Sequence, residues 1–421
     1  MLKKAIASLI IFTILFSCSA KKEKADLIIH NALIYSVDSS FTLYEAMAIK
    51  DGKILELNTT EQILKKYEAA ETNDAQGKAV FPGFIDAHCH FLGYGLGLQK
   101  IDLSGTKSFE EVIQRVKDFS VKTDEAENPK LKNETEWIVG RGWDQNDWEL
   151  KEYPDNKKLD SLFPNTPVLL KRIDGHAALV NSEALKRAGI NEKTKISGGE
   201  LLMKNGKLTG VLIDNAVDLV SSKIPAASKE KMQQALLAAQ KNCFEVGLTT
   251  VDDAGIMKYE VDVMDELQKS NQLKMRIYAM LSDSAPNYKY YLEKGPYKTD
   301  HLNVRSFKFY ADGALGSRGA CLLQNYSDKK DWKGFLLNSP KHFEQSAKLM
   351  YQKSFQMNTH CIGDSATRLM FYIYATAPRV AFDTDGKIFK AVMKEMRWRI
   401  EHAQVVYNKD VEYFKYIIHK I

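Results

Sequence analysis

The stretch that decides the fold runs from residue 80 to residue 90 and reads Val80-Phe-Pro-Gly-Phe-Ile-Asp-Ala-His-Cys-His90. It is an apolar, strand-like segment that ends in two histidines, His88 and His90, with Asp86 just before them. Residues two apart on a strand point to the same face, so both imidazoles can reach one cation. Asp86 shares that face and is placed to orient a metal-ligating side chain without binding the metal itself. The motif therefore predicts a metal site at the end of a strand.

Two further histidines close later strand-like runs. His360 ends the run Gln356–His360, and His402 ends the run Trp398–His402. Short strand-like runs that alternate with helical stretches predict an α/β barrel or a doubly wound sheet. Active-site residues of such barrels lie at the C-terminal ends of different strands, so we expect these histidines to meet His88 and His90 in one site.

Lys308 lies at the centre of an apolar strand-like run, between Phe307 and Phe309. The two aromatic rings are expected to face the helix layer, which places Lys308 inside the barrel. A buried ammonium needs a partner or must lose its charge. Reaction with carbon dioxide would turn it into a carboxylate able to bridge two cations. The alternative is an ion pair with Asp312 or Asp253.

Upstream of the metal motif, residues 26–80 are predicted to form a small β domain. The runs Ala46–Lys50 and Lys53–Leu57 flank Asp51-Gly52, which is a strong hairpin signal. Residues 81–421 are predicted to form the barrel. Between about residues 99 and 224 turn-rich segments interrupt the strand–helix alternation, which indicates an insertion that shapes the substrate pocket.

The N-terminus has the pattern of an export signal. Two lysines precede an apolar run, Ala5–Phe16, that is too short to span a bilayer. Residues Leu15–Cys18 resemble a lipobox, in which Cys18 is lipidated and becomes the new N-terminus; residues 1–18 are then the signal peptide and 19–25 a tether. The alternatives are an uncleaved anchor, an ordinary cleaved signal or a free thiol. The lipobox interpretation anchors the protein to a membrane of a bacterial cell envelope, exported to the periplasmic or outer-membrane side.

Composition excludes several other classes of protein. A net charge of +5 over 421 residues, with the basic residues spread along the chain, argues against a nucleic-acid partner. The five cysteines have no short paired spacing, which argues against a zinc ribbon or a disulfide framework.

The segment Pro82–His90 resembles the first-strand signature of the amidohydrolase superfamily. Later motifs are similar to its amidohydrolase-3, YtcJ-like branch, which includes N-substituted formamide deformylases. The resemblance extends from about Leu27 to the C-terminus. Its later motifs are Gly142–Gln145, Arg172–Ala177 with Asn181–Ser182, Lys308–Ser317, Thr359–Asp364 and Glu401–Gln404.

The resemblance implies a TIM-like (β/α) barrel that holds one or two divalent cations, zinc by its preference for imidazole. Within the insertion, His176 looks like a pocket residue that polarises the substrate carbonyl or holds its loop. Asp253 is expected to be structural. The implied metal ligands are His88 and His90 from the first strand, carboxylated Lys308 from the fourth, and His360 and His402 from the fifth and sixth.

The implied activity is hydrolysis of a non-peptide carbon–nitrogen bond in a small amide by a metal-activated water. The superfamily's general base is an aspartate after the eighth strand, and this chain has no residues for a seventh or eighth strand. We therefore expect an incomplete barrel, unstable and nearly inactive when the 421-residue chain is expressed alone. The alternatives are a metal-dependent esterase or lactonase and an inactive, lipid-anchored binding protein on the same fold.

Overall fold

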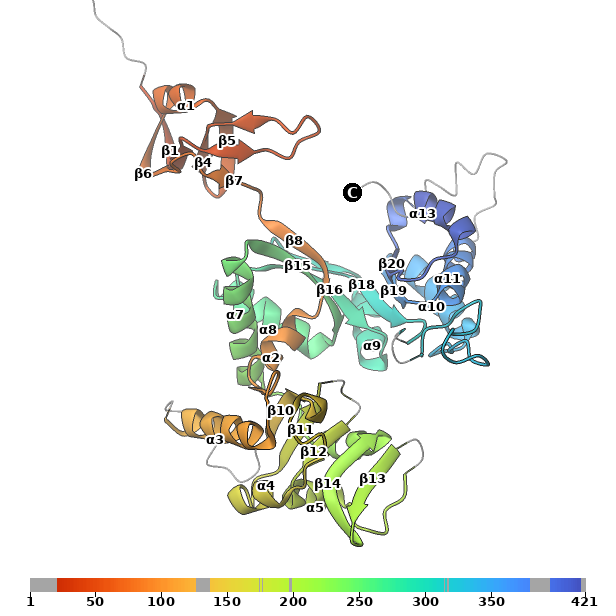
Figure 1. Cartoon of the computed structure of the whole chain (residues 1–421). Helices are drawn as coiled ribbons and strands as arrows, with labels where there is room; N and C mark the ends of the chain where they lie inside the picture. The colour runs from red at the N-terminus through yellow and green to blue at the C-terminus, as the bar shows by residue number, and fades with distance from the viewer. Residues whose placement is uncertain are drawn as a thin grey trace, which may run out of the picture. The chain divides into compact units, whose positions relative to one another are not determined.

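The computed structural model describes residues 21–125, 137–173, 175, 177–196, 199–313, 315, 318–378 and 394–417. The chain divides into two compact units, with the boundary between Phe84 and Ile85 (Figure 1). The predicted signal peptide with Cys18, and the pocket residue His176, lie outside the described residues.

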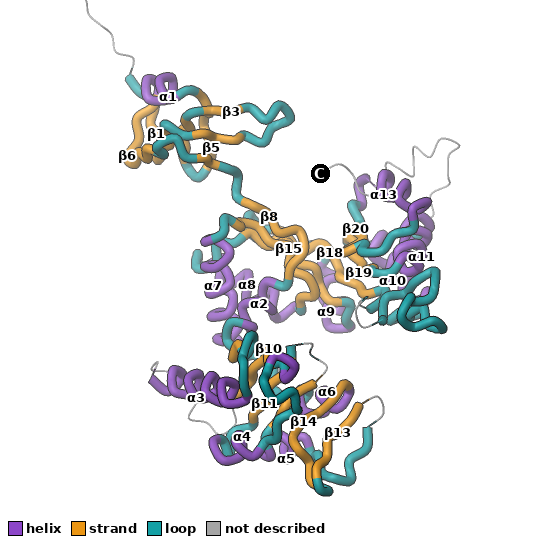
Figure 2. Tube along the Cα trace, in the orientation of Figure 1, coloured by secondary structure: helices purple, strands orange, loops and turns teal. Residues whose placement is uncertain are grey.

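The first unit is a small β domain with two sheets and one helix, α1 (Thr60–Lys66) (Figure 2). The predicted hairpin is confirmed: β4 and β5 pair antiparallel, and the φ angles of Asp51 and Gly52 are 51° and 71°. The sheets have the orders β5-β4-β1-β6 and β3-β2-β7. Their strands are β1 (Glu23–His30), β2 (Leu33–Tyr35), β3 (Leu43–Tyr44), β4 (Ala46–Lys50), β5 (Lys53–Asn58), β6 (Tyr67–Asp74) and β7 (Ala79–Val80).

The first strand starts earlier than the sequence predicts. Glu23 already pairs with Tyr67 of the parallel strand β6, and Lys24 forms an ion pair of 2.8 Å with Glu68. The tether expected through residue 25 therefore ends by residue 22. Backbone pairing does not require apolar side chains, so the polar composition of residues 23–25 hides the start of the strand.

The second unit contains the predicted barrel-type α/β sheet. Its strand order is β20-β19-β18-β16-β15-β8, and each pair from β15 to β20 is parallel. Of these strands, β15, β16, β18, β19 and β20 are each followed by a helix (Figure 1), and the short strand β17 pairs antiparallel with β18 outside this order. These elements are β8 (Phe84–Cys89), α2 (Phe91–Gly97), α7 (Lys229–Glu245), β15 (Leu248–Ile256), α8 (Lys258–Lys269), β16 (Arg276–Ser282), α9 (Ala285–Lys294), β17 (Tyr297–Lys298), β18 (Leu302–Tyr310), α10 (Pro340–Gln352), β19 (Gln356–Cys361), α11 (Asp364–Thr376), β20 (Arg399–His402) and α13 (Val411–Ile417).

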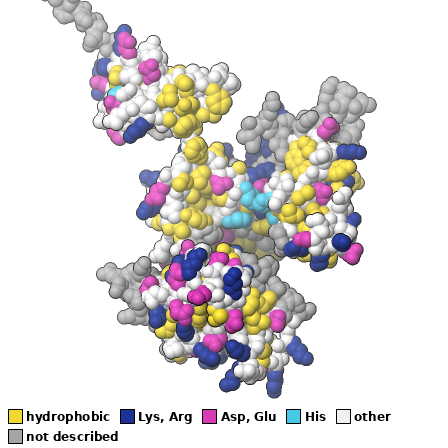
Figure 3. Space-filling view, in the orientation of Figure 1, with side chains coloured by type: hydrophobic (Ala, Val, Ile, Leu, Met, Phe, Trp, Pro, Cys, Tyr) yellow, Lys and Arg dark blue, Asp and Glu magenta, His cyan; other side chains and the backbone are white. Residues whose placement is uncertain are grey.

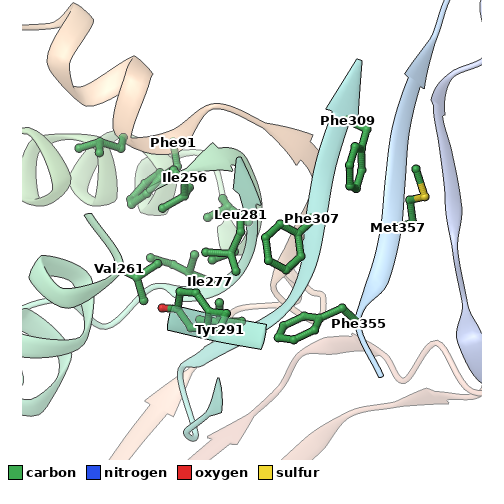
Figure 4. Packing of buried hydrophobic residues seen from close by; sticks show 14 of the residues in the cluster. Phe91, Ile256, Val261, Ile277, Leu281, Tyr291, Phe307, Phe309, Phe355 and Met357 are labelled. Atoms are coloured by element: carbon green, nitrogen blue, oxygen red, sulfur yellow. The ribbon is translucent and has the colours of Figure 1, made fainter. Parts of the chain in front are cut away.

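The core of this unit lies between the parallel sheet and its helices. Phe307 and Phe309 are fully buried there (Figure 4), and the ring of Phe307 stacks on Tyr288 of α9 at 5.1 Å. Because neighbouring residues of a strand point to opposite faces, Lys308 faces away from this layer. The sequence-based orientation of Phe307, Lys308 and Phe309 is therefore confirmed.

The region that interrupts the alternation forms a sheet of its own, with the order β13-β14-β12-β11-β10-β9. Its pairs are parallel from β9 to β11 and antiparallel from β11 to β13. In the parts of the chain described here, no helix is long and apolar enough to cross a membrane. The elements of this region are β9 (Ile101–Asp102), α3 (Phe109–Glu125), β10 (Ile138–Trp143), α4 (Lys157–Leu162), β11 (Val168–Arg172), β12 (Ala177–Val180), α5 (Ser182–Ala188), β13 (Gly199–Lys204), β14 (Lys207–Asp214) and α6 (Asn215–Ser221).

Candidate functional site

Four histidines of the second unit form one contiguous cluster, and Figure 3 shows histidine side chains grouped on one face. His88 lies on β8 with His90 directly after that strand, His360 lies on β19, and His402 ends β20. The ring centroids of His402 lie 4.6 Å from those of both His88 and His360, and His88 lies 5.8 Å from His90. The cluster thus occupies the carboxyl ends of three strands.

His402 reaches this cluster through an unusual backbone conformation. Consecutive residues of a regular strand point to opposite faces. Yet Glu401 Oε2 lies 2.5 Å from His88 Nδ1, and the ring of His402 also contacts His88. The φ angles of His402 and Ala403 are 70° and 42°, so the chain leaves the extended conformation at this point. Such left-handed residues cost about 1–3 kcal/mol and persist where the surrounding structure holds them.

Hydrogen bonds fix the protonated nitrogen of two histidines. His90 Nδ1 lies 2.9 Å from the carbonyl oxygen of Ala254, which can only accept, so Nδ1 carries the proton. His88 Nδ1 faces the carboxylate of Glu401 in the same way. With the proton on Nδ1, the lone pair of each ring lies on Nε2, and in His88 that atom lies 3.4 Å from Lys308 Nζ.

The side chain of Lys308, on β18, points at the histidine cluster. Its side chain is 1% exposed, its Nζ lies 3.4 Å from His88 Nε2, and the ring of Tyr310 lies 4.6 Å from the Nζ. No carboxylate in the described part of the chain forms an ion pair with it. Burial lowers the pKa of Lys308 to about 8, a shift that Glu401 opposes and Arg399 reinforces. The amine is thus partly neutral near physiological pH.

Burial also favours the neutral form of three histidines. It lowers the pKa of His402 to about 4, with further lowering by electrostatic interaction with the neighbouring basic groups of His360, His88 and Lys308. Burial likewise lowers the pKa values of His90 and His360. Neutral imidazole is the form that binds a cation.

Asp253, expected to be structural, caps the helix that follows the first histidine pair. It is fully buried and accepts hydrogen bonds from the backbone amides of Phe91 and Leu92, at 2.9 and 3.1 Å. His90 occupies the N-cap position of α2 and makes no side-chain capping bond itself. Asp253 therefore supplies the cap from the neighbouring strand, and it does not pair with Lys308.

Asp312, the other predicted ion-pair partner of Lys308, also binds backbone amides. Its carboxylate accepts hydrogen bonds from the amides of Ile362, Gly363 and Cys321, at 2.8 to 2.9 Å. It thereby ties the loop after β18 to the turn after β19. The proposed ion pair of Lys308 with Asp312 or Asp253 is therefore not formed.

Two motifs of the inserted region also meet. Arg172 donates to Gln145 Oε1 at 2.9 Å and to Asp144 Oδ1 at 2.5 Å. The two stretches that carried the resemblance, around residues 142–145 and 172–177, are thus joined by side chains.

Sequence reasoning missed Glu401 and Arg399. Arg399 Nε lies 2.7 Å from Glu401 Oε1, and its Nη1 donates to Asp252 Oδ2 at 2.6 Å. The sequence did contain a signal for them. Arg399 and Glu401 are two residues apart, which puts both side chains on one face of a strand that ends in a histidine.

The chemistry of these donors fits a divalent cation. His360 Nε2 is buried and has no hydrogen-bond partner among the described residues, and imidazole nitrogens are preferred zinc ligands. The rings contact one another edge-on, with interplanar angles of 64° to 90°. Within the described ranges, no three His, Cys, Asp or Glu side chains are already arranged around a metal ion.

Comparison with known proteins decides the family, because the amidohydrolase family model matches residues 71–418. The chain belongs to the amidohydrolase family. It is 32% identical over 399 residues to YtcJ of Bacillus subtilis (strain 168), named as an amidohydrolase, covering 91% of this chain and 70% of that protein. It is 28% identical over 238 residues to an N-substituted formamide deformylase of Arthrobacter pascens, covering 54% of this chain and 42% of that enzyme. Membership places this amidohydrolase among hydrolases.

The fold has a solved counterpart. A metal-dependent hydrolase of uncharacterised function from Pyrococcus horikoshii OT3 superimposes with a TM-score of 0.72 at 24% identity, covering 93% of this chain and 73% of that one. At this identity the match establishes the shared fold.

Proposed function

We propose that this amidohydrolase hydrolyses non-peptide carbon–nitrogen bonds of small amides. The observation that carries the proposal is the meeting of four histidines and a buried lysine at the ends of parallel strands. Catalytic groups of (β/α) barrels occupy this position. Family membership and the similarity to a formamide deformylase support the amide class.

We further propose that His88, His90, His360 and His402 hold one or two divalent cations, zinc by preference. A cation bound there would supply a water of lowered pKa and polarise the substrate carbonyl. Glu401 and Ala254 orient two of the rings by their Nδ1 hydrogen bonds. The lowered pKa of Lys308 supports its carboxylation, because only the neutral amine reacts with carbon dioxide.

The test is a substrate panel with the metal controlled. The full chain, stripped with a chelator and then reloaded with Zn²⁺, is assayed against N-formyl and N-acetyl amines and against the matching esters and lactones. We expect hydrolysis of amides, N-substituted formamides above all, only in the reloaded protein. Ester or lactone cleavage alone would assign the esterase alternative. Metal uptake without turnover of any compound would favour a binding protein.

The protein's place in the cell is also a proposal. The lipobox-like sequence that ends at Cys18 supports export and attachment to a bacterial envelope membrane. The amide substrate would then be met outside the cytoplasm.

A further inference from the structure

Glu401 is a buried carboxylate that reaches the histidine cluster. Its side chain is 4% exposed, and Oε2 lies 2.5 Å from His88 Nδ1. A buried charge is costly unless it is paired. Arg399 provides the pairing, with its Nε 2.7 Å from Oε1 and its Nη2 3.0 Å from Oε2. Arg399 therefore forms ion pairs with both carboxylate oxygens. Among the described residues Oε2 is hydrogen-bonded by Arg399 and His88, whereas Oε1 has no hydrogen bond.

Arg399 makes two further contacts that involve neighbouring strands. Its Nη1 donates to Asp252 on β15 at 2.6 Å, and its Nη2 donates to the carbonyl oxygen of Ala87 on β8. Ala87 directly precedes His88. One guanidinium thus joins β20, β15 and β8, and it holds the backbone next to the ring that Glu401 holds.

These contacts matter because β8 and β20 are the two edges of the parallel sheet in the described residues. Adjacent strands are placed by backbone hydrogen bonds, but these two have none between them in that strand order. The separation of His88 from His402 therefore depends on the curvature of the sheet and on side-chain contacts between its two edges. Arg399 and Glu401 supply two of the contacts that bridge the edges.

We propose that Arg399 and Glu401 form a positioning pair that holds His88 with its proton on Nδ1 and its lone pair on Nε2, the nitrogen that would bind a divalent cation. The inference rests on the proposed function only for the identity of the ligand. Glu401 fixes the tautomer and the ring plane of His88. Arg399 compensates the negative charge of Glu401 and holds strand β8 by its hydrogen bond to the carbonyl oxygen of Ala87. Partners of this kind typically change metal affinity 10- to 100-fold when they are removed.

The variants are Glu401→Gln, which removes the charge, and Arg399→Lys, which keeps a charge but loses the planar fork. The matched control is Asp410→Asn. Asp410 is also a buried carboxylate of this unit, bound by Arg368 Nε at 2.8 Å, and no histidine of the described residues bonds to it. The control removes the same kind of pair and reports the general loss of stability.

Two measurements decide the proposal. Competition with a chromophoric chelator gives the Zn²⁺ affinity, and we expect a loss of about 10- to 100-fold in both variants and none in Asp410→Asn. Long-range ¹H–¹⁵N spectra of the metal-free wild-type chain give the tautomer, and we expect His88 to be protonated on Nδ1. In Glu401→Gln the resonance should shift or split as the tautomer becomes less defined.

Wild-type affinity in both variants, or a wild-type His88 protonated on Nε2, would overturn the positioning role. The tautomer measurement needs no metal and no folded variant, so it decides the role even if a variant fails to fold. A wild-type chain that binds no Zn²⁺ but shows the Nδ1 tautomer would refute the proposed metal function and leave the pair intact.

Discussion

The rings of His88 and His402 lie 4.6 Å apart although they belong to the two edge strands of the sheet. Neighbouring strands within the sheet keep their residues in register by backbone pairing, as His360 and Glu401 do across β19 and β20. The contact between β8 and β20 instead depends on the curvature of the whole sheet and on Arg399. The candidate site is thus sensitive to any change that alters this curvature.

The first prediction concerns the metal ligands. Replacing His88 and His90 together by Ala should abolish Zn²⁺ binding, because two of the four clustered imidazoles are lost. Elemental analysis after loading and gel filtration measures the stoichiometry. His301→Ala, which changes a partly buried histidine elsewhere in the same unit, is the matched control and should bind as wild type. Full metal content in the double variant would remove both residues from the site.

The second prediction concerns Lys308. If the amine is carboxylated, ¹³C-bicarbonate added with Zn²⁺ should give a carbamate carbon resonance that is absent in Lys308→Ala. Short carboxylic acids such as acetate should partly restore metal binding to that variant. Lys274→Ala, at an exposed lysine, controls for carbamates elsewhere. A Zn²⁺-loaded wild-type chain without the resonance would leave Lys308 a plain buried amine.

The third prediction contrasts two glycines. A Cβ on Gly363 would lie 2.0 Å from the carbonyl oxygen of Cys321, whereas one on Gly97 would meet nothing within 4 Å. Gly363→Ala should destabilise the protein by about 2–3 kcal/mol, because the loop at Cys321 must move. Gly97→Ala, at the end of helix α2, should be neutral or stabilising by up to about 1 kcal/mol. Urea unfolding measures both. Equal effects of the two substitutions on the free energy of unfolding would contradict the close approach of Gly363 to Cys321.

The fourth prediction is a pH dependence at Asp253. Burial raises its pKa from 3.8 to about 7, although the amides of Leu92 and Phe91 oppose the shift. A carboxyl with a raised folded-state pKa contributes stability that is complete below pH 3.8 and is lost as the pH rises through 7. Relative to Asp253→Asn, the wild type should therefore lose about 3 kcal/mol between pH 5 and pH 8.

Urea unfolding at several pH values measures this difference, and Asp118→Asn, on the exposed face of α3, gives the background dependence. A difference between wild type and Asp253→Asn that does not change with pH would show that Asp253 stays ionised throughout.

The fifth prediction tests the anchor. Cys18→Ser should abolish labelling by a fatty-acid analogue in a bacterial host and release the protein from the membrane fraction or stall its processing. Cys243→Ser, at a buried cysteine, should label as wild type. Unchanged labelling of the Cys18 variant would refute the lipobox interpretation.

Local patterns were sufficient to predict much of the barrel. The alternation of Phe307, Lys308 and Phe309 gave the orientation of the lysine, because side-chain direction on a strand depends only on position. The ends of the runs at His88, His360 and His402 gave the place of the histidines, because parallel strands carry their carboxyl ends to one edge.

Other features depend on contacts between distant segments. The bond between Glu401 and His88 joins residues that only the curvature of the sheet brings together, and no local pattern encodes it. The left-handed backbone of His402 has no clear composition signal, since only a small share of non-glycine residues adopt it. The mixed sheet of the inserted region was missed because short strands there lie among turns and polar residues.

Asp312 recognises Cys321, Ile362 and Gly363 through their backbone amides, which every amino acid except proline possesses. These hydrogen bonds therefore do not depend on which side chains occupy the three positions. What limits these positions is packing: Cys321 packs against the hydrophobic core of the unit, and Ile362 packs with Ala320 and Tyr326. Substitutions at these positions should therefore disturb the scaffold that holds the histidines through packing, and not through the hydrogen bonds to Asp312.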